Sequence, residues 1–295
     1  MSTETFDRIA TIREFLRAAG AGGRSIGLVP TMGALHDGHG TLIEKARKEC
    51  DVVVVSIYVN PTQFGPDEDH ERYPRQAADD EVYCEVRGVD AIFAPSDDQM
   101  YPEPLETSVR PGIEARRLCG PFRPGHFEAV LTVVLKLFAI TGPDRAYFGD
   151  KDFQQRILVA RMVRDLDLPV EIVSCPIARE SDGLAISSRN RYLKPEEREV
   201  ASVLNRALRV ARQRMADGES DPAVAIEAAR TVIDLVPQAR IEYLEVVDPE
   251  RLQPVGTVSG PVRIAGAIWI GETRLIDNLE CDSKRKRRRK KKAEG

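Results

Sequence analysis

Two histidines three residues apart, His36 and His39, lie in a segment whose spacing suits an anion. The apolar run 26–29 predicts a short buried strand, Pro30 predicts a turn, and residues 41–47 have helical spacing. Positions i and i+3 share one face of a helix, and the free N–H groups and dipole of a helix start attract phosphate. The pattern predicts a phosphate site, although a zinc site with a third ligand or a purely structural pair would also fit it.

A second segment of this kind contains Lys151. Residues 149–155 again run from the end of a predicted strand to the start of a helix. Lys151 would place a point charge beside a phosphate, and Gln155 lies one turn further on roughly the same face. The alternative is a surface Asp-Lys-Asp sequence whose charges satisfy one another.

Amides and hydroxyls offer further binding groups. Asn60 and Gln63 follow the apolar run 52–59 in a proline-stiffened loop, where they suit a substrate that bears a hydroxyl or carboxylate. Asx-turn bonding is an alternative for Asn60. Residues 187–191 (SSRNR) combine hydroxyls with two guanidiniums, which suits an oxyanion clamp or simply a polar linker between domains.

Adjacent acids at Asp79 and Asp80 could bind Mg²⁺ beside phosphates. Acids at the start of a helix are also favourable with its dipole. The sequence favours the dipole interpretation slightly.

The order of the expected elements predicts the fold. Strands and helices alternate up to about residue 175, which is typical of a parallel sheet covered on both faces. Expected strands are 26–29, 52–59, 90–95, 145–148 and 170–173, with a further short strand near 107–110; expected helices are 6–20, from about 36, 73–87, 127–140 and 152–165.

After about residue 178 the pattern changes to a polar loop, two helices and a strand alternation. We expect helices at 195–216 and 222–236 and strands at 240–247, 262–270 and 273–276. The prediction is an α/β fold, a Rossmann-like doubly wound parallel sheet (1–177) with a second, smaller α+β C-terminal lid domain (178–282) and a basic tail (283–295). The polar loops 30–39, 60–65 and 149–155 would then meet at the carboxyl edge of the sheet, where ligands bind.

Composition narrows the class of protein. The 295 residues are 42% hydrophobic, and five scattered cysteines favour a reducing compartment over a disulfide framework. The sequence has no apolar run of about 18 residues, and its start lacks the features of a secretory signal. We therefore expect no membrane span.

The net charge of −4 conceals an asymmetry. Removing the nine consecutive basic residues 284–292 and the acid Glu294 leaves −12 for residues 1–283. Such a tail could attract nucleic acid or another polyanion, although a solvated, disordered tail is the favoured interpretation.

The sequence lacks the motifs that several reaction classes use. The sequence has no Gly-x-Ser-x-Gly, no Walker motif and no Gly-x-Gly-x-x-Gly. Nucleotidyl transfer remains, because an in-line attack on the α-phosphate of a nucleotide needs positioning and charge stabilisation more than covalent chemistry.

Several segments of the sequence resemble the motifs of a known family. Residues 30–39 (PTMGALHDGH) resemble the HIGH-type signature of the nucleotidylyltransferase superfamily and, more narrowly, the pantothenate synthetase (pantoate–β-alanine ligase) family. Further segments follow in that family's order and spacing: 59–64, 73–75, 123–127, 149–155, 187–193 and 273–278. The resemblance spans residues 26 to about 280.

The resemblance implies a ligase. Pantoate would attack Mg·ATP to give pantoyl adenylate and pyrophosphate, and β-alanine would then displace AMP. His36, His39 and Lys151 would stabilise the phosphates, with His39 as proton donor. The ATP contacts implied are Met32, Gly33, Ala34, Leu35, His36, Asp37, Gly38, His39, Gly149, Asp150, Lys151, Asp152, Ala178, Ile186, Ser187, Ser188 and Arg189.

The same resemblance implies the remaining roles. Gln63 and Gln155, with Asn60 beside them, would hold pantoate, and Gln63 would also face β-alanine. Asp80 would be a magnesium neighbour, residues 186–189 a mobile loop that closes on ATP, and the enzyme a cytoplasmic homodimer. A different adenylyl- or cytidylyltransferase on the same scaffold is the alternative.

Three residues depart from the family's usual pattern. Ile186 replaces a common Met, Asp150 a usual Glu, and Gly40 a larger apolar residue. None of the matched polar residues is missing.

Overall fold

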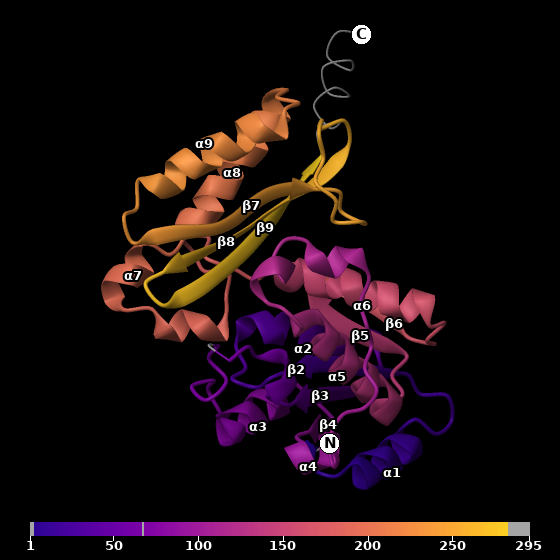
Figure 1. Ribbon diagram of the computed structural model, residues 1–295. Helices are drawn as coiled ribbons and strands as arrows, with labels where there is room; N and C mark the ends of the chain where they lie inside the picture. The colour runs from indigo at the N-terminus through magenta and orange to yellow at the C-terminus, as the bar shows by residue number, and fades with distance from the viewer. Residues whose placement is uncertain (1–2, 67, 283–295) are drawn as a thin grey trace. The chain divides into compact units, whose positions relative to one another are not determined.

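The computed structural model describes residues 3–66 and 68–282, which form two compact units (Figure 1). The first unit comprises the chain up to Gly112 and Phe122–Ala178. The second comprises Ile113–Pro121 and the described residues from Arg179 to Asp282. The basic residues 284–292 lie outside the described residues, so the prediction of a polyanion-binding tail stays a prediction.

A six-stranded parallel sheet forms the centre of the first unit, in the order β1-β4-β3-β2-β5-β6. Its strands are β1 Glu4–Phe6, β2 Ile26–Thr31, β3 Val52–Ile57, β4 Ala91–Phe93, β5 Arg145–Gly149 and β6 Glu171–Cys175. The α-helices of the unit are α1 Ile9–Ala19, α2 Asp37–Glu49, α3 Ala77–Glu85, α4 Asp97–Met100, α5 His126–Thr141 and α6 Phe153–Asp165. The predicted doubly wound fold is confirmed.

Alternating side chains of the central strands bury both faces of this sheet. Val29 of β2 and Val53 of β3 pack into a cluster with Ile43 of α2. Leu28 and Val54 are also buried and point to the opposite face, because successive side chains of a strand alternate. On that face α5 packs against β2 and contacts both α1 and α6. Burial on both faces explains the continuous apolar runs of these strands.

The first unit differs from expectation at its edge and in one loop. β1 was not predicted: it has only three residues, two of them exposed, and it forms the edge of the sheet beside β4. Residues 107–110, which the structure describes, form no strand. The helix predicted over 73–87 begins only at Ala77, after Pro74.

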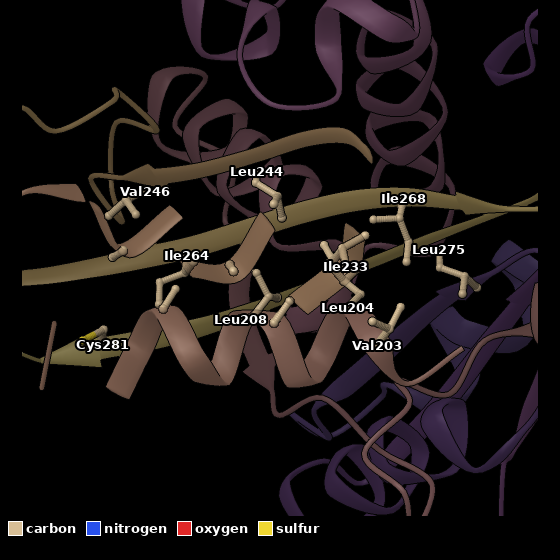
Figure 2. Close-up of a cluster of buried hydrophobic side chains, with 14 of the residues drawn as sticks. Val203, Leu204, Leu208, Ile233, Leu244, Val246, Ile264, Ile268, Leu275 and Cys281 are labelled. Atoms are coloured by element: carbon tan, nitrogen blue, oxygen red, sulfur yellow. The ribbon is translucent and has the colours of Figure 1, made fainter. Parts of the chain in front are cut away.

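In the second unit, helices cover a three-stranded antiparallel sheet in the order β7-β8-β9. The elements are α7 Pro195–Val200, α8 Val203–Asp217, α9 Pro222–Asp234, β7 Ala239–Val247, β8 Pro261–Ile270 and β9 Thr273–Asp282. Figure 1 shows α8 and α9 on one face of the sheet. Side chains of α8 such as Leu204 and Leu208 meet Ile264 and Ile268 of β8 in a buried apolar cluster (Figure 2).

Two elements of this unit differ from the sequence prediction. The helix expected over 195–216 breaks at residues 201–202, where the N–H of Ala201 bonds to Arg198 O, only three residues back. β9 continues to Asp282 instead of ending at 276, although Asp277 and Asn278 are polar and buried. Polar residues at inward positions interrupted the apolar pattern that marks a strand.

Two further observations concern the predicted domain organisation. Residues 113–121 group with the second unit, which the prediction of a single boundary at 177/178 did not anticipate. Within the described part of the chain, every helix is too short or too polar to cross a bilayer.

Candidate active site

Three loops leave the carboxyl edge of the first unit's sheet from neighbouring strands. β3, β2 and β5 are adjacent and parallel, with Ile57 opposite Thr31 and Ala146 opposite Leu28. β2 lies where the strand order reverses, because later strands add on its other side. Such a switch point is where open α/β sheets bind ligands. The structure thus brings together the three segments that the sequence placed after strands.

The loop after β2 has an unusual backbone that one buried carboxylate holds. Gly33 and Ala34 both have positive φ, 77° and 50°. This left-handed conformation directs the N–H groups of Ala34 and Leu35 toward Asp80 of α3, whose two oxygens accept them at 2.9 and 2.7 Å. Asp80 is only 2% exposed. A single residue 45 positions away therefore fixes the chain that leads into His36.

His36 and His39 are brought together at the start of α2. His36 is the N-cap residue, and its Nδ1 accepts the N–H of Gly38 at 3.1 Å, so that Nε2 carries any proton of the neutral ring. The two rings stack with centroids 4.1 Å apart. A histidine at this position satisfies a free helix N–H in the way that Ser or Asp usually does.

The surroundings keep His39 uncharged. Burial, followed by the charges of His36 and Lys151, lowers the pKa of His39 well below its usual range. His39 Nδ1 is buried and makes no hydrogen bond within residues 3–66 and 68–282. A neutral imidazole of this kind can donate an N–H hydrogen bond to a phosphate without bringing a second positive charge.

Lys151 supplies a cation at this edge. It lies in a short 3-10 turn, Asp150–Asp152, that joins β5 to α6. Its Nζ is 3.8 Å from Asp152 Oδ2, while Asp150 forms a separate 2.6 Å ion pair with Arg156. The charges of the Asp-Lys-Asp sequence therefore do not simply cancel one another, and Lys151 is near enough to His39 to affect its pKa.

The loop after β3 brings two amides to the same edge. Asn60 caps the 3-10 turn Pro61–Gln63 by accepting the N–H of Thr62, which confirms the Asx-type turn for this residue. Gln63 is partly exposed, and its Nε2 lies 2.8 Å from the sulfur of Met32 in the loop after β2. Gln155 is the third residue of α6. Asn60 is thus occupied by the turn, whereas Gln63 connects two loops.

Gly40, one of the departures, has a steric explanation. A Cβ added to Gly40 would lie 2.6 Å from Tyr83 Oη and 3.0 Å from Arg87 Nε, because Arg87 stacks on the Tyr83 ring against α2. The same tyrosine hydroxyl donates to Asp37, the exposed first residue of α2. A larger residue at position 40 would displace this pair.

The contacts of Asp80 do not favour direct magnesium binding. Both of its oxygens accept backbone N–H groups, and such bonds compensate for the burial of a polar group. Among the described residues, no three or more His, Cys, Asp or Glu side chains gather as a metal site would require. Mg²⁺ needs few protein ligands when phosphates bind it.

In the second unit, the predicted mobile loop is tightly tied at its base. Arg179 pairs with Ala185 as a β-bridge, and its guanidinium makes two 2.8 Å bonds to the buried carboxylate of Asp277. Asn190 Nδ2 donates to Ala185 O, and Ser187 Oγ accepts from Arg189 N. The loop is therefore a closed, hydrogen-bonded unit, and the contact of Ile186, Ser187, Ser188 and Arg189 with ATP stays a prediction.

Sequence reasoning did not assign a role to three side chains that form a chain of contacts ending at the Gln63 carbonyl. His126, Arg123 and Glu68 connect the start of α5 to the main chain of Gln63. Residues 123–127 were noticed only for their resemblance to a family motif. The one sequence feature that could have drawn attention to His126 is its place directly after a glycine at the start of a predicted helix.

Comparisons with known proteins point to one family. The family model described as Pantoate-beta-alanine ligase matches residues 4–280. The chain is 50% identical over 276 residues to the pantothenate synthetase of Moorella thermoacetica, covering 94% of this chain and 98% of that protein. It is 51% identical over 273 residues to pantothenate synthetase 1 of Bradyrhizobium diazoefficiens, covering 92% and 96%.

Solved structures show the same similarity. The crystal structure of the Thermus thermophilus pantothenate synthetase aligns with a TM-score of 0.89 at 47% identity, covering 94% of this chain and 98% of that one. A Francisella tularensis pantoate-beta-alanine ligase, crystallised with beta-gamma ATP and beta-alanine, aligns with a TM-score of 0.78 at 36% identity. The alignment covers 94% of this chain and 97% of that chain.

Proposed function

Because the chain belongs to the pantoate–β-alanine ligase family, we propose that it condenses (R)-pantoate with β-alanine in two steps. In the first, a pantoate carboxylate oxygen attacks the α-phosphorus of Mg·ATP. The bond to the β-phosphate oxygen breaks and pyrophosphate leaves. In the second, the amine of β-alanine attacks the acyl carbon of pantoyl adenylate, the bond to the AMP oxygen breaks, and the amine loses a proton. The product is pantothenate.

The observation that carries this proposal is the pairing of His36 and His39 at the start of α2, with the charge of Lys151 acting on His39. Negative charge accumulates on the phosphate oxygens as pyrophosphate departs. A neutral His39 N–H and the Lys151 ammonium are fixed donors for that charge, and preorganised donors of this kind are the main source of stabilisation in such sites. We assign His39 the hydrogen bond to the leaving oxygen, which its neutral ring donates without giving up the proton.

Substrate positions follow from the remaining loops. The loop of Met32, Gly33, Ala34 and Leu35 offers backbone beside the nucleotide, and residues 149–152 approach it from β5. Gln63 and Gln155 hold the pantoate hydroxyls and carboxylate, with Gln63 also facing β-alanine. Residues 186–189 close over ATP, which suits a reactive acyl adenylate that water would hydrolyse.

Pantoate-dependent ATP–pyrophosphate exchange tests the first step, and β-alanine-dependent release of AMP tests the second. The proposal expects no exchange without pantoate. Exchange that needs no pantoate would favour another nucleotidylyltransferase on the same scaffold.

A Gln63→Ala variant tests the substrate assignment. Its KM for pantoate should rise about tenfold while its KM for ATP stays the same, because about 1.4 kcal/mol of hydrogen bonding is lost from pantoate alone. An equal rise in both would contradict the assigned role of Gln63.

Assembly, metal and location complete the proposal. We expect a homodimer, which light scattering on a sizing column would show as twice the chain mass. Activity should require Mg²⁺ in proportion to ATP, since the ion enters with the nucleotide. A cytoplasmic location follows from the family resemblance and the odd, scattered cysteines, and cell fractionation tests it.

A further inference from the structure

The turn that carries Gln63 is held from outside by its main chain. Asn60 and Pro61 shape the turn internally, with Phe64 N bonding back to Pro61 O. The carbonyl oxygen of Gln63 points away from this internal pattern to His126, the first residue of α5, whose Nδ1 lies 2.8 Å away. His126 is only 8% exposed. This is a specific contact between residues 63 positions apart.

The neighbours of His126 fix which nitrogen carries its proton. A carbonyl oxygen can only accept, so Nδ1 must carry the hydrogen. Nε2 lies 2.7 Å from Arg123 Nη1, and a guanidinium can only donate, so Nε2 must accept. Burial and the Arg123 charge lower the pKa of His126 to about 4. The imidazole is therefore a neutral Nδ1–H tautomer whose two hydrogen bonds run from Arg123 to Gln63.

Arg123 is itself held by Glu68. Arg123 Nε donates to Glu68 Oε1 at 2.7 Å and Nη2 donates to Oε2 at 2.5 Å, an arrangement in which both carboxylate oxygens are used. Burial alone would raise the pKa of Glu68, but the hydrogen bonds and charge of Arg123 lower it overall. The ion pair thus orients Nη1 toward His126. It also brings Nη2 to 3.4 Å from Gln63 O, where it is a second and longer donor beside the 2.8 Å bond from His126.

Gly125 makes this arrangement possible in the backbone. It caps α5 with φ 79°, a left-handed conformation, so that the chain reverses between Arg123 and His126. A Cβ added to Gly125 would meet nothing within 4 Å, so the requirement concerns conformation and not space. Two side chains three residues apart can therefore face each other across the start of the helix.

We propose that His126 is a positioning residue for the pantoate step: the Glu68–Arg123 ion pair fixes its tautomer, and its Nδ1–H holds the main chain of Gln63 in place. This inference rests on the proposed function, because it takes Gln63 as a pantoate ligand. His126 itself need not touch substrate. Its effect reaches the reaction through the position of the Gln63 side chain.

Two amide variants of His126 separate the two hydrogen bonds. In His126→Asn the amide N–H can occupy the place of Nδ1 and donate to Gln63, while the bond from Arg123 is lost. In His126→Gln the amide reaches the place of Nε2, and the bond to Gln63 is lost. His70→Asn is the matched control. His70 packs on Phe64, the residue after Gln63, but among the described residues it makes no hydrogen bond to the Gln63 carbonyl.

The measurement is KM for pantoate and for ATP in the exchange assay with the full chain. We expect the KM for pantoate to rise about tenfold in His126→Gln and about threefold in His126→Asn. The KM for ATP should stay unchanged in both, and His70→Asn should behave as wild type. Equal effects of the two His126 variants, or a parallel rise in the KM for ATP, would overturn the proposal.

A spectroscopic readout measures the tautomer in the wild-type chain itself, and a variant serves only to assign the signal. Nitrogen NMR of the four histidines should show one neutral ring in which Nδ1 is protonated and Nε2 is not. The signals of this ring should be missing from the spectrum of His126→Asn, which assigns them to His126. A ring protonated on Nε2 instead of Nδ1 would overturn the proposal. If the wild-type chain shows no pantoate-dependent exchange, the proposed function fails instead, and the two failures are distinguished.

Discussion

The loops after β2 and β3 leave the same edge of one sheet, yet opposite kinds of contact hold them. After β2, two backbone N–H groups donate to the buried carboxylate of Asp80. After β3, one backbone carbonyl accepts from the neutral ring of His126. An anion holds the first loop and an uncharged donor holds the second.

The difference follows from the backbone of each loop. Successive left-handed residues at Gly33 and Ala34 turn neighbouring N–H groups to the same side, and such a pair needs one strong acceptor. The turn at residues 61–63 bonds the N–H groups of residues 62–64 internally, while the carbonyl of Gln63 accepts from His126 outside the turn. The β2 loop should therefore depend more strongly on its anchor than the β3 loop does.

Replacing Asp80 should have the largest effect. Asp80→Ala leaves two buried N–H groups without an acceptor, and we expect a loss of about 4 kcal/mol in the free energy of unfolding. Because His36 follows this loop directly, exchange activity should fall about a hundredfold. Denaturant unfolding and the exchange assay measure the two effects.

Two further variants give this prediction its control. Asp80→Asn keeps one acceptor and should lose less, and the exposed neighbour in Asp79→Asn should lose almost nothing. Unchanged stability in Asp80→Ala together with a raised Mg²⁺ requirement would show that Asp80 is a metal ligand after all.

Acid should weaken the β3 loop through His126. Its pKa is about 4 in the folded chain and about 6.5 in an unfolded one. Between these values the unfolded state binds a proton that the folded state does not, so stability falls as pH falls from 6.5 to 4, by about 3 kcal/mol. Protonation would place a cation beside Arg123, with Glu68 and Asp152 as the nearby acids that oppose this repulsion.

Unfolding free energies at about pH 7 and pH 4.5 test this contribution. The difference between the two values should be smaller in His126→Asn than in wild type or His70→Asn. The same difference in all three proteins would mean that other groups cause the acid sensitivity.

Two left-handed glycines compare the two regions: Gly33 lies in the β2 loop, and Gly125 precedes His126, which anchors the β3 loop. In Gly33→Ala the new Cβ would lie 2.9 Å from Asp80 Oδ2 and 3.0 Å from Ile57 Cγ2, whereas in Gly125→Ala it would meet nothing within 4 Å. We expect losses of about 2–3 kcal/mol at Gly33, from conformation and crowding, and about 1 kcal/mol at Gly125, from conformation alone. Thermal unfolding ranks the two, and an equal or reversed order would contradict the assigned role of Asp80.

The smallest effect concerns the helix into which the β2 loop leads. Gly40→Ala should gain about 1 kcal/mol of helix propensity and lose a similar amount, because the methyl group crowds Tyr83 Oη. In a Tyr83→Phe background most of that crowding disappears, and the same change should then stabilise the chain. If Gly40→Ala has the same effect in both backgrounds, Tyr83 does not occupy the space at Gly40.

The sequence predicted the elements that carry strong periodicity and the loops that connect them. The buried strands β2 and β3 and the helix α5 were found because continuous apolar runs mark elements buried on both faces. β1 was missed because three residues with two exposed carry no pattern. The end of β9 was missed because its buried Asp277 serves Arg179 instead of the apolar core.

The candidate site was predictable to the level of which loops meet. His36, Lys151 and Gln63 could be placed because each follows a predicted strand, and parallel strands end at one edge. The side chains that hold these loops could not be predicted. Asp80 and His126 bond to backbone groups 45 and 63 positions away. Every residue has such backbone groups, so the sequence at the contacted positions gives no sign of the contact.

The central claim is that a pantoate carboxylate attacks the α-phosphorus of ATP, and an isotope transfer tests it most directly. Pantoate labelled with oxygen-18 in its carboxylate is incubated with the enzyme, Mg·ATP and β-alanine, and the products are analysed by mass spectrometry. We expect one labelled oxygen in AMP and none in pyrophosphate. Unlabelled AMP formed together with pantothenate would contradict it.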